Sequence, residues 1–244
     1  MGLVTQETAA SKFSGADPFK GAANSKLRTL IVFDDLPNIW VVRADSGIHS
    51  LSDLQGKAFN AGINGSATEL MSNIALSALG IKIDAVKGAT KDAVEAIQDR
   101  HIVGYVKAGW HDASILNVMA TTKVNFLTFT PQEEETVKAK IPPGVIWFTV
   151  PKDTYEGQPA VRAFGFALGV VTTTALSADD GYAVLKAQDL GFKDMSTAYP
   201  DIAGKNLWTK TVEASGIYLH AGAVKLLREK GISVPDKLVP PEAK

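Results

Sequence analysis

The sequence predicts an α/β fold with a mainly parallel sheet, and the alternation of predicted strands and helices is the observation that supports it. Segments rich in β-branched and aromatic residues alternate along the chain with segments of helical periodicity. The chain has 244 residues and is 45% hydrophobic, which is enough to bury a core in one large or two small domains. It contains no cysteine, so disulfides, thiolate catalysis and iron–sulfur clusters are excluded.

Two buried strands are predicted near the start of the chain. Residues 10–27 are small and polar, which predicts a short helix followed by a loop. Leu27–Phe33 and Ile39–Arg43 are mostly apolar and rich in β-branched residues, as strands are. The segment Asp-Asp-Leu-Pro at 34–37 has the composition of a turn, so we expect it to separate the two strands.

The rest of the chain continues the alternation. A helical turn over 50–54 leads into a strand over 56–62, and the helix that follows ends at Gly80. Further helices are predicted over 91–98, 110–118, 132–140, 179–189, 193–198, 206–214 and 221–230. Further strands are predicted over 102–106, 125–128, 145–150 and 164–171.

Charge and hydropathy exclude several functional classes. With 25 basic and 26 acidic residues spread evenly, the chain has no basic stripe for a nucleic acid. Its longest apolar run, 164–171, is far shorter than the ~20 residues of a spanning helix, so we do not expect a membrane-embedded protein. The first eight residues lack the features of a signal peptide, and with this start the chain would stay in the cytoplasm.

The most informative local motif is Gly-Ile-Asn-Gly-Ser-Ala-Thr-Glu at 62–69, which follows a predicted strand and opens a helix. Backbone N–H groups at such a helix start can bind a carboxylate or phosphate, and Gly62 and Gly65 would allow close approach. Ser66 followed by Glu69 is also a capping box, which stabilises a helix without any ligand. On the residues alone both interpretations stay open, and plain capping is the commoner of the two.

Other chemistry-bearing residues give weaker signals. Trp40, Tyr105 and Trp110 lie at or just beyond predicted strands, where ligands enter α/β sheets, although core packing accounts for large aromatics equally well. The acidic pair at 34–35 fits turn chemistry, and His111-Asp112 fits a helix start better than an acid–base pair. The four histidines lack metal-ligand spacing. We therefore expect no metal, no cofactor and no enzyme activity.

Five segments in one order resemble a known family. These are Val-Val-Arg-Ala-Asp-Ser-Gly-Ile at 41–48, Leu-Ser-Asp-Leu-Gln-Gly-Lys at 51–57, Gly-Ile-Asn-Gly-Ser-Ala-Thr at 62–68, Tyr-Glu-Gly-Gln at 155–158, and Leu-His-Ala-Gly-Ala-Val-Lys at 219–225 with Arg-Glu-Lys-Gly at 228–231. Together they make the chain, from Gly2 to Pro240, similar to the TAXI-type solute-binding proteins of TRAP transporters.

The resemblance implies a type II periplasmic-binding-protein fold, in which two lobes each have a mainly parallel sheet flanked by helices and a ligand cleft lies between them. The first lobe would comprise residues 1–43 and 164–244, and the second 44–163. Such a protein captures a small carboxylate, a glutamate-like amino acid or a dicarboxylate, by lobe closure. It delivers the solute to the TRAP-type membrane subunit. The resemblance thus places the protein in the periplasm, and we expect a monomer.

The family pattern also indicates candidate ligand-binding residues. A first-lobe strand end matches Thr5 and Gln6, and a second-lobe strand end matches the segment from Tyr105 to Gly109, including Lys107. The helix start of the second lobe matches Gly65, Ser66, Ala67 and Thr68. Trp40 is also a candidate, because it lies at a predicted strand where ligands enter α/β sheets.

Three departures from the family pattern keep alternatives open. The family begins with a strand–helix–strand unit that this sequence does not contain, Ile-Val-Gly at 102–104 replaces Ile-Asp-Ala, and Ala221 replaces a proline. One alternative is an NMT1/THI5-like small-molecule-binding protein or enzyme of the same fold, with a reactive histidine or a cofactor-bound lysine. Another is an interaction module that docks a further chain on its first lobe.

Overall fold

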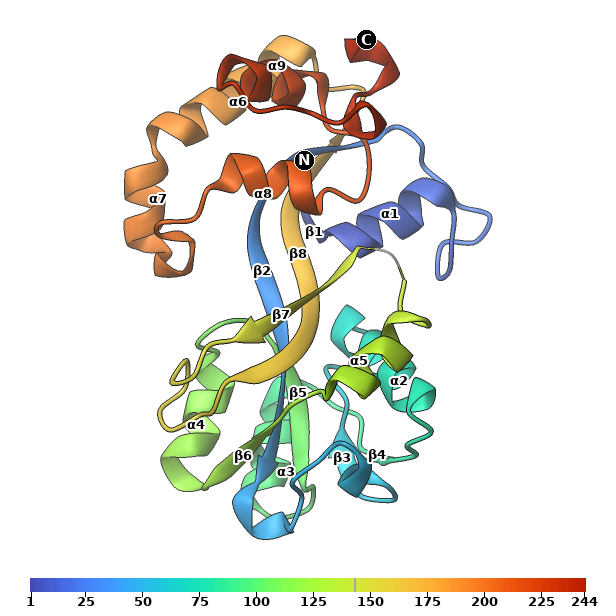
Figure 1. Ribbon diagram of the computed structural model, residues 1–244, viewed down its shortest axis with the longest axis vertical. Coiled ribbons are helices and arrows are strands. Elements are labelled where there is room, and N and C mark those ends of the chain that lie inside the picture. The colour runs from blue at the N-terminus through green and yellow to red at the C-terminus, as the bar shows by residue number, and fades with distance from the viewer. Residues whose placement is uncertain (143) are drawn as a thin grey trace. The chain divides into compact units, whose positions relative to one another are not determined.

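The computed structural model describes residues 1–142 and 144–244, and the α/β class is confirmed (Figure 1). The helices are α1 (Gln6–Ser14), α2 (Ala67–Ala78), α3 (Thr90–Gln98), α4 (Ala113–Thr121), α5 (Pro131–Lys138), α6 (Ala178–Leu190), α7 (Phe192–Ala198), α8 (Leu207–Ala214) and α9 (Ala221–Glu229). The strands are β1 (Gly2–Thr5), β2 (Leu27–Arg43), β3 (Ala58–Asn60), β4 (Asp84–Ala85), β5 (Gly104–Ala108), β6 (Val124–Leu127), β7 (Val145–Val150) and β8 (Val161–Thr173).

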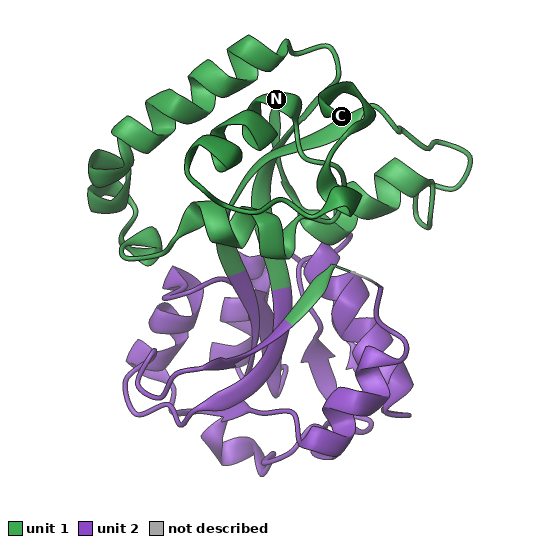
Figure 2. Ribbon diagram, turned by 45° about the horizontal axis from the view of Figure 1, so that its top comes forward, with its two compact units in different colours: residues 1–35, 143–146, 166–244 green, residues 36–142, 147–165 purple. Residues whose placement is uncertain are grey.

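The chain packs into two compact units (Figure 2). Unit 1 consists of Met1–Asp35, Pro143–Ile146 and Phe166–Lys244, and unit 2 of Leu36–Pro142 and Trp147–Gly165. Strands β2, β7 and β8 each contribute residues to both units. The sequence-based lobe boundary at 43/44 falls at the end of β2, and the boundary at 163/164 falls within β8, whereas the units meet at 35/36 and 165/166.

Strand pairing is mixed, and the prediction of a mainly parallel sheet is wrong. In unit 1, β1 pairs antiparallel with β8. In unit 2, β5 and β6 both pair antiparallel with β2, while β3 pairs parallel with β4 and β5. Parallel pairing requires a crossover connection, and helices α2 and α3 provide it between β3, β4 and β5.

The predicted turn at 34–37 is also wrong, because β2 runs without a break from Leu27 to Arg43. Asp34 is fully buried within this strand, where its carboxylate accepts hydrogen bonds from the Tyr199 hydroxyl at 2.5 Å and from Lys205 Nζ at 2.8 Å. Asp35 binds Lys210. The two carboxylates are therefore matched by partners about 170 residues away, which a composition-based turn prediction cannot detect.

The core of unit 2 forms around β2 and β5. Trp40 is 1% exposed and packs against the rings of Phe59, Phe129 and Phe164. A Cβ on Gly104 would lie 2.1 Å from the Val41 carbonyl oxygen, so the glycine that departs from the family pattern is required by this strand pair. The apolar faces of β2 and β5 thus fix the framework on which the polar groups of unit 2 lie.

The core of unit 1 is formed by the start of β2 and the C-terminal helices. Leu30 and Ile31 are buried with Leu219, Leu226 and Leu227 in one apolar cluster. Among the residues that the structure describes, none of the helices combines the length and the apolar character needed to cross a membrane.

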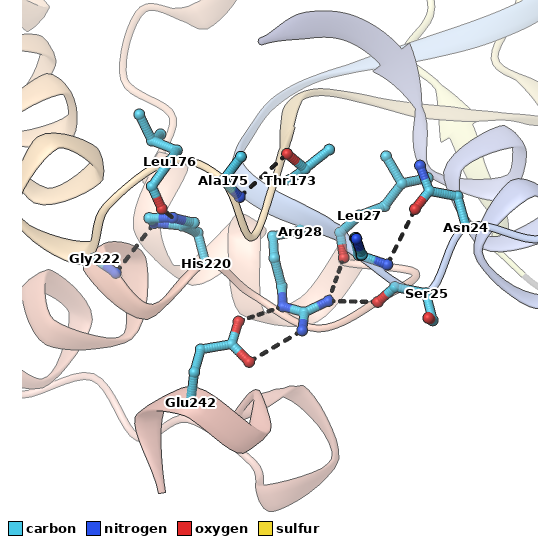
Figure 3. Close-up of polar contacts among 11 residues, drawn as sticks. Asn24, Ser25, Leu27, Arg28, Thr173, Ala175, Leu176, His220, Gly222 and Glu242 are labelled. Carbon is cyan, nitrogen blue, oxygen red and sulfur yellow. Dashed lines mark hydrogen bonds and ion pairs between the residues drawn. The ribbon is translucent and has the colours of Figure 1, made fainter.

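Polar contacts fasten the C-terminal segment to the start of β2 (Figure 3). The Arg28 guanidinium donates to both carboxylate oxygens of Glu242, at 2.6 and 3.0 Å, and to the Ser25 and Leu27 carbonyls. His220 caps α9, since its Nδ1 accepts the Gly222 N–H at 3.2 Å and its Nε2 lies 3.0 Å from the Leu176 carbonyl oxygen. The His-Ala-Gly motif of the closing helix therefore has a structural role.

Candidate functional site

The start of α2 carries the predicted capping arrangement. The Ser66 hydroxyl oxygen accepts the Glu69 N–H at 3.1 Å, and the Glu69 carboxylate accepts the Gly65 N–H at 2.6 Å. Gly62 has φ of 136°, and a Cβ there would lie 2.7 Å from the Glu69 nitrogen. The cap is confirmed, and Gly62 is needed so that the loop can approach the helix closely.

The capped start of α2 is also a possible anion-binding position, which the Glu69 carboxylate partly fills. The backbone N–H groups of Ala67 and Thr68 stand in the first turn of α2, where a helix supplies no acceptor of its own. Free N–H groups in the first turn attract a carboxylate, and the helix dipole reinforces the attraction. The Glu69 carboxylate already lies beside them, so a ligand carboxylate would bind against a neighbouring negative charge.

A second polar group of unit 2 lies where β5 leads into α4. The Tyr105 hydroxyl lies 3.3 Å from Ser114 Oγ, and the Asp112 carboxylate accepts the Ser114 N–H at 2.8 Å. Lys107 Nζ lies 3.6 Å from Asp112 Oδ2, and the lysine side chain is 22% exposed. Tyr105 itself is buried, and burial raises its pKa to about 12, so its phenol stays neutral. Lys107 supplies the cation of this group.

Two further residues shape the same corner. The Asp112 N–H donates to the Tyr155 hydroxyl oxygen at 2.9 Å, and the ring of His111 lies 6.3 Å from that of Tyr155. Gly109 has φ of 129° and donates its N–H to the Pro37 carbonyl. Sequence reasoning missed Ser114 and Tyr155. The Asp-x-Ser cap at the start of α4 was the available signal for Ser114, and the Tyr-Glu-Gly-Gln motif at 155–158 was the available signal for Tyr155.

Trp40 lies apart from these groups, inside the aromatic core of unit 2. Its ring stacks on Phe59 with 5.8 Å between centroids and meets Phe129 and Phe164 edge to face. This position matches the packing interpretation of the residue. In unit 2, the structure therefore brings Lys107 and Tyr105 together with Asp112 and Ser114, and holds Ser66 and Thr68 separately at the start of α2.

Unit 1 contributes a buried polar group at the start of α1. The Gln6 side chain is fully buried, and its Oε1 accepts from Thr29 Oγ1 at 2.9 Å and from the Gly216 N–H at 3.3 Å. Glu7 is 3% exposed, and its carboxylate accepts hydrogen bonds from the hydroxyls of Thr5 and Thr8. Thr5 ends β1 and Gln6 begins α1, and their role in binding a ligand stays a prediction.

Each of these buried side chains leaves one atom without a partner. Within the described part of the chain, Gln6 Nε2 and Glu7 Oε2 are buried and have no hydrogen-bond partner. Burial raises the pKa of Glu7, and hydrogen bonds from Thr5 and Thr8 offset part of that rise. A buried donor and a buried acceptor without partners are costly, and a ligand with both kinds of group would satisfy them. Sequence reasoning missed Glu7.

The described residues contain no group of three His, Cys, Asp or Glu side chains arranged to hold a metal ion. The polar groups above consist of amide, hydroxyl, ammonium and carboxylate functions that hydrogen-bond one another. Their chemistry is suited to recognising a small polar molecule through donors, acceptors and one cation.

Comparisons with known proteins give a family and a set of remote structural likenesses. The model of the NMT1-like family matches residues 1–231. Among curated protein sequences, none matches this chain. The periplasmic aliphatic sulphonate-binding protein SsuA from Escherichia coli is 14% identical, with a TM-score of 0.40; the match covers 95% of this chain and 61% of that protein.

A second solved structure gives a similar result. An ABC transporter protein from Parabacteroides distasonis is 14% identical, with a TM-score of 0.44, and the match covers 98% of this chain and 80% of that protein. This chain thus spans only about three fifths of the length of the sulphonate-binding protein. At these scores neither likeness assigns a ligand to this chain.

Proposed function

The chain belongs to the NMT1-like family, and on that premise we propose that it is a solute-binding receptor rather than an enzyme. One observation carries the proposal: two separately packed units share β2, β7 and β8, so the connections between them are continuous strands. A few residues at such connections can absorb the dihedral changes of hinge closure. The chain passes between the units at Asp35–Leu36 in β2 and at Gly165–Phe166 in β8, so we place the hinges there rather than at 40–43.

The proposed solute is a small carboxylate, namely a glutamate-like amino acid or a dicarboxylate. The first-turn N–H groups of Ala67 and Thr68 and the ammonium of Lys107 suit carboxylate groups. The unpartnered acceptor of Glu7 suits an ammonium group, which favours an amino acid over a dicarboxylate. Binding would favour the closed state because closure adds contacts that the open state lacks.

The proposed destination of the solute is a TRAP-type membrane transporter, and the proposed location is the periplasm. The support is the ordered set of five motifs that resembles TAXI-type receptors. We propose that the receptor acts as a monomer.

A thermal melt with and without L-glutamate, L-aspartate, L-glutamine, succinate and malate tests the proposal. A solute at 100 times its dissociation constant adds ~2.7 kcal/mol of apparent stability, which a melt detects. We expect one amino acid to raise the melting temperature and to reduce the radius of gyration measured by small-angle X-ray scattering. A cooperative melt that no compound shifts would contradict the proposed ligand class.

The NMT1-like family match also supports the second candidate, an NMT1/THI5-like small-molecule-binding protein or enzyme. Such an enzyme would use a reactive histidine or a cofactor-bound lysine. His220 does not suit this role, since its Nδ1 accepts the Gly222 N–H and its Nε2 lies 3.0 Å from the Leu176 carbonyl oxygen. Turnover of a pyridoxal-type compound, or its absorbance band on the protein, would favour this candidate over the receptor.

A further inference from the structure

A cavity of about 520 Å³ in unit 2 is lined by residues from three segments, 43–45, 97–100 and 121–123. Those that carry charge are Arg43, Asp45, Arg100 and Lys123. None of the candidate solute-binding residues lines it. We propose that this cavity binds a phosphate-class oxyanion, independently of the solute.

The cavity is built by backbone bonds between neighbouring elements. Arg43 ends β2, and its N–H donates to the Val103 carbonyl at 2.8 Å, while the Ala44 N–H donates to the Lys123 carbonyl at 2.9 Å. Arg100 follows α3 with φ of 65°, a left-handed conformation that is uncommon for a side chain of this size. These bonds bring residues from the ends of β2, α3 and α4 to one place.

The charge of the cavity is positive. Three cationic side chains, Arg43, Arg100 and Lys123, face a single carboxylate, that of Asp45. Arg100 Nη2 lies 2.9 Å from Asp45 Oδ2, and Arg43 Nε lies 3.3 Å from Asp45 Oδ1. One carboxylate thus serves two guanidiniums, and two positive charges remain for a ligand to neutralise.

Arg43 is the residue that most requires an anion. Its side chain is only 12% exposed, and in the described part of the chain its buried Nη1 has no hydrogen-bond partner, while its buried Nε has only the ion-pair contact with Asp45 at 3.3 Å. Buried guanidinium N–H groups that make no hydrogen bond are unfavourable, and a nearby anion offsets that cost. Cations such as Arg100 and Lys123 are also stabilised by the C-terminal ends of helices, but Arg43 lies on a strand, where that explanation does not apply.

The arrangement suits a tetrahedral dianion. Two guanidiniums and one ammonium from separate segments can bind several oxygens of one ligand, and two uncompensated charges match a phosphate at neutral pH. A singly charged halide can neutralise only half of this charge and accepts no forked pair of hydrogen bonds. Phosphate should therefore bind in preference to chloride at equal ionic strength.

Isothermal titration calorimetry of the full chain with inorganic phosphate tests the proposal, with sodium chloride at matched ionic strength as the reference. We expect saturable phosphate binding that weakens about tenfold in Arg43→Gln. Because Arg43 is mostly buried, the exposed Arg100→Gln and Lys123→Gln variants provide a second test, with expected losses of about two- to fivefold each.

Lys91→Gln is the matched control, since Lys91 is an exposed lysine of the same unit and lies outside the cavity. Its phosphate affinity should equal that of the parent chain. Equal phosphate binding by all variants, or no saturable binding by the parent chain, would overturn the proposal. The titration contains no amino acid or dicarboxylate, so its outcome does not depend on the proposed solute.

Discussion

The ring of His220 lies against Gly181, where a Cβ on the glycine would come within 2.3 Å of His220 Nδ1. The two residues belong to the contact between α9 and α6, and a Cβ on Gly222 would likewise lie 2.4 Å from the Tyr182 nitrogen. Hydrogen bonds to the Gly222 N–H and the Leu176 carbonyl fix the histidine ring. The small residues therefore allow these two helices to pack backbone against backbone.

Gly181→Ala should reduce the free energy of unfolding by about 1–3 kcal/mol, the usual cost of overpacking. An exposed helix would instead gain ~1 kcal/mol from this substitution, so the sign separates the two effects. Urea denaturation measures the change. Gly191→Ala is the control, because a Cβ there would have its nearest neighbour at 3.4 Å. A stabilised Gly181→Ala variant would show that the helices can move apart.

The pair formed by Glu134 and Arg162 should make stability depend on pH. The Arg162 guanidinium donates to both Glu134 oxygens at 2.6 Å and, with help from Lys138, lowers the pKa of that carboxyl to about 2. The folded pKa lies below the unfolded value, so the stabilisation is complete above about pH 5 and is lost as the pH falls toward 2.

Glu134→Gln should therefore cost about 1–3 kcal/mol at pH 7 and flatten the acid limb of the stability profile. Glu135→Gln, on the same helix, removes only a surface ion pair with Lys138 and should cost less than about 0.5 kcal/mol. Chemical denaturation at several pH values between 2 and 7 measures both. Parallel profiles for the parent and Glu134→Gln would contradict the assignment.

Glu7 should have the opposite effect on stability. Burial raises its folded pKa above the unfolded value, so the folded chain gains stability as the pH falls from neutral through that raised pKa. Glu7→Gln should raise the melting temperature at pH 7 by about 2–4 °C and remove this pH dependence. If Glu7 receives the ammonium of an amino acid, the same variant loses amino-acid affinity. A more stable variant with unchanged affinity would separate Glu7 from the proposed site.

Substitutions at the start of α2 test whether the solute carboxylate binds there. Ser66→Ala combined with Thr68→Val should weaken solute binding about tenfold while the chain still folds. Glu69→Gln removes the negative charge beside the first-turn N–H groups and should strengthen binding about two- to fivefold. Calorimetric titration with the solute found in the thermal melts measures all three affinities. Unchanged affinity in the double variant would exclude this helix start from the site.

Features that depend on neighbouring residues could be predicted from the sequence alone. The Ser66 cap, the strand at 145–150 and the C-terminal helices were found from spacing and periodicity, because capping and amphipathic burial depend on residues a few positions apart. Thr5 and Gln6 could be proposed from family motifs, whereas the burial of Glu7 beside them could not.

Features that depend on residues far apart in the sequence could be found only from the tertiary structure. The acidic pair at 34–35 lies in a continuous strand because Tyr199, Lys205 and Lys210 neutralise it from the other end of the sequence. The cation-lined cavity forms because three elements bring Arg43, Arg100 and Lys123 together. Burial and electrostatic pairing are long-range properties, so they appear only when the whole chain has packed.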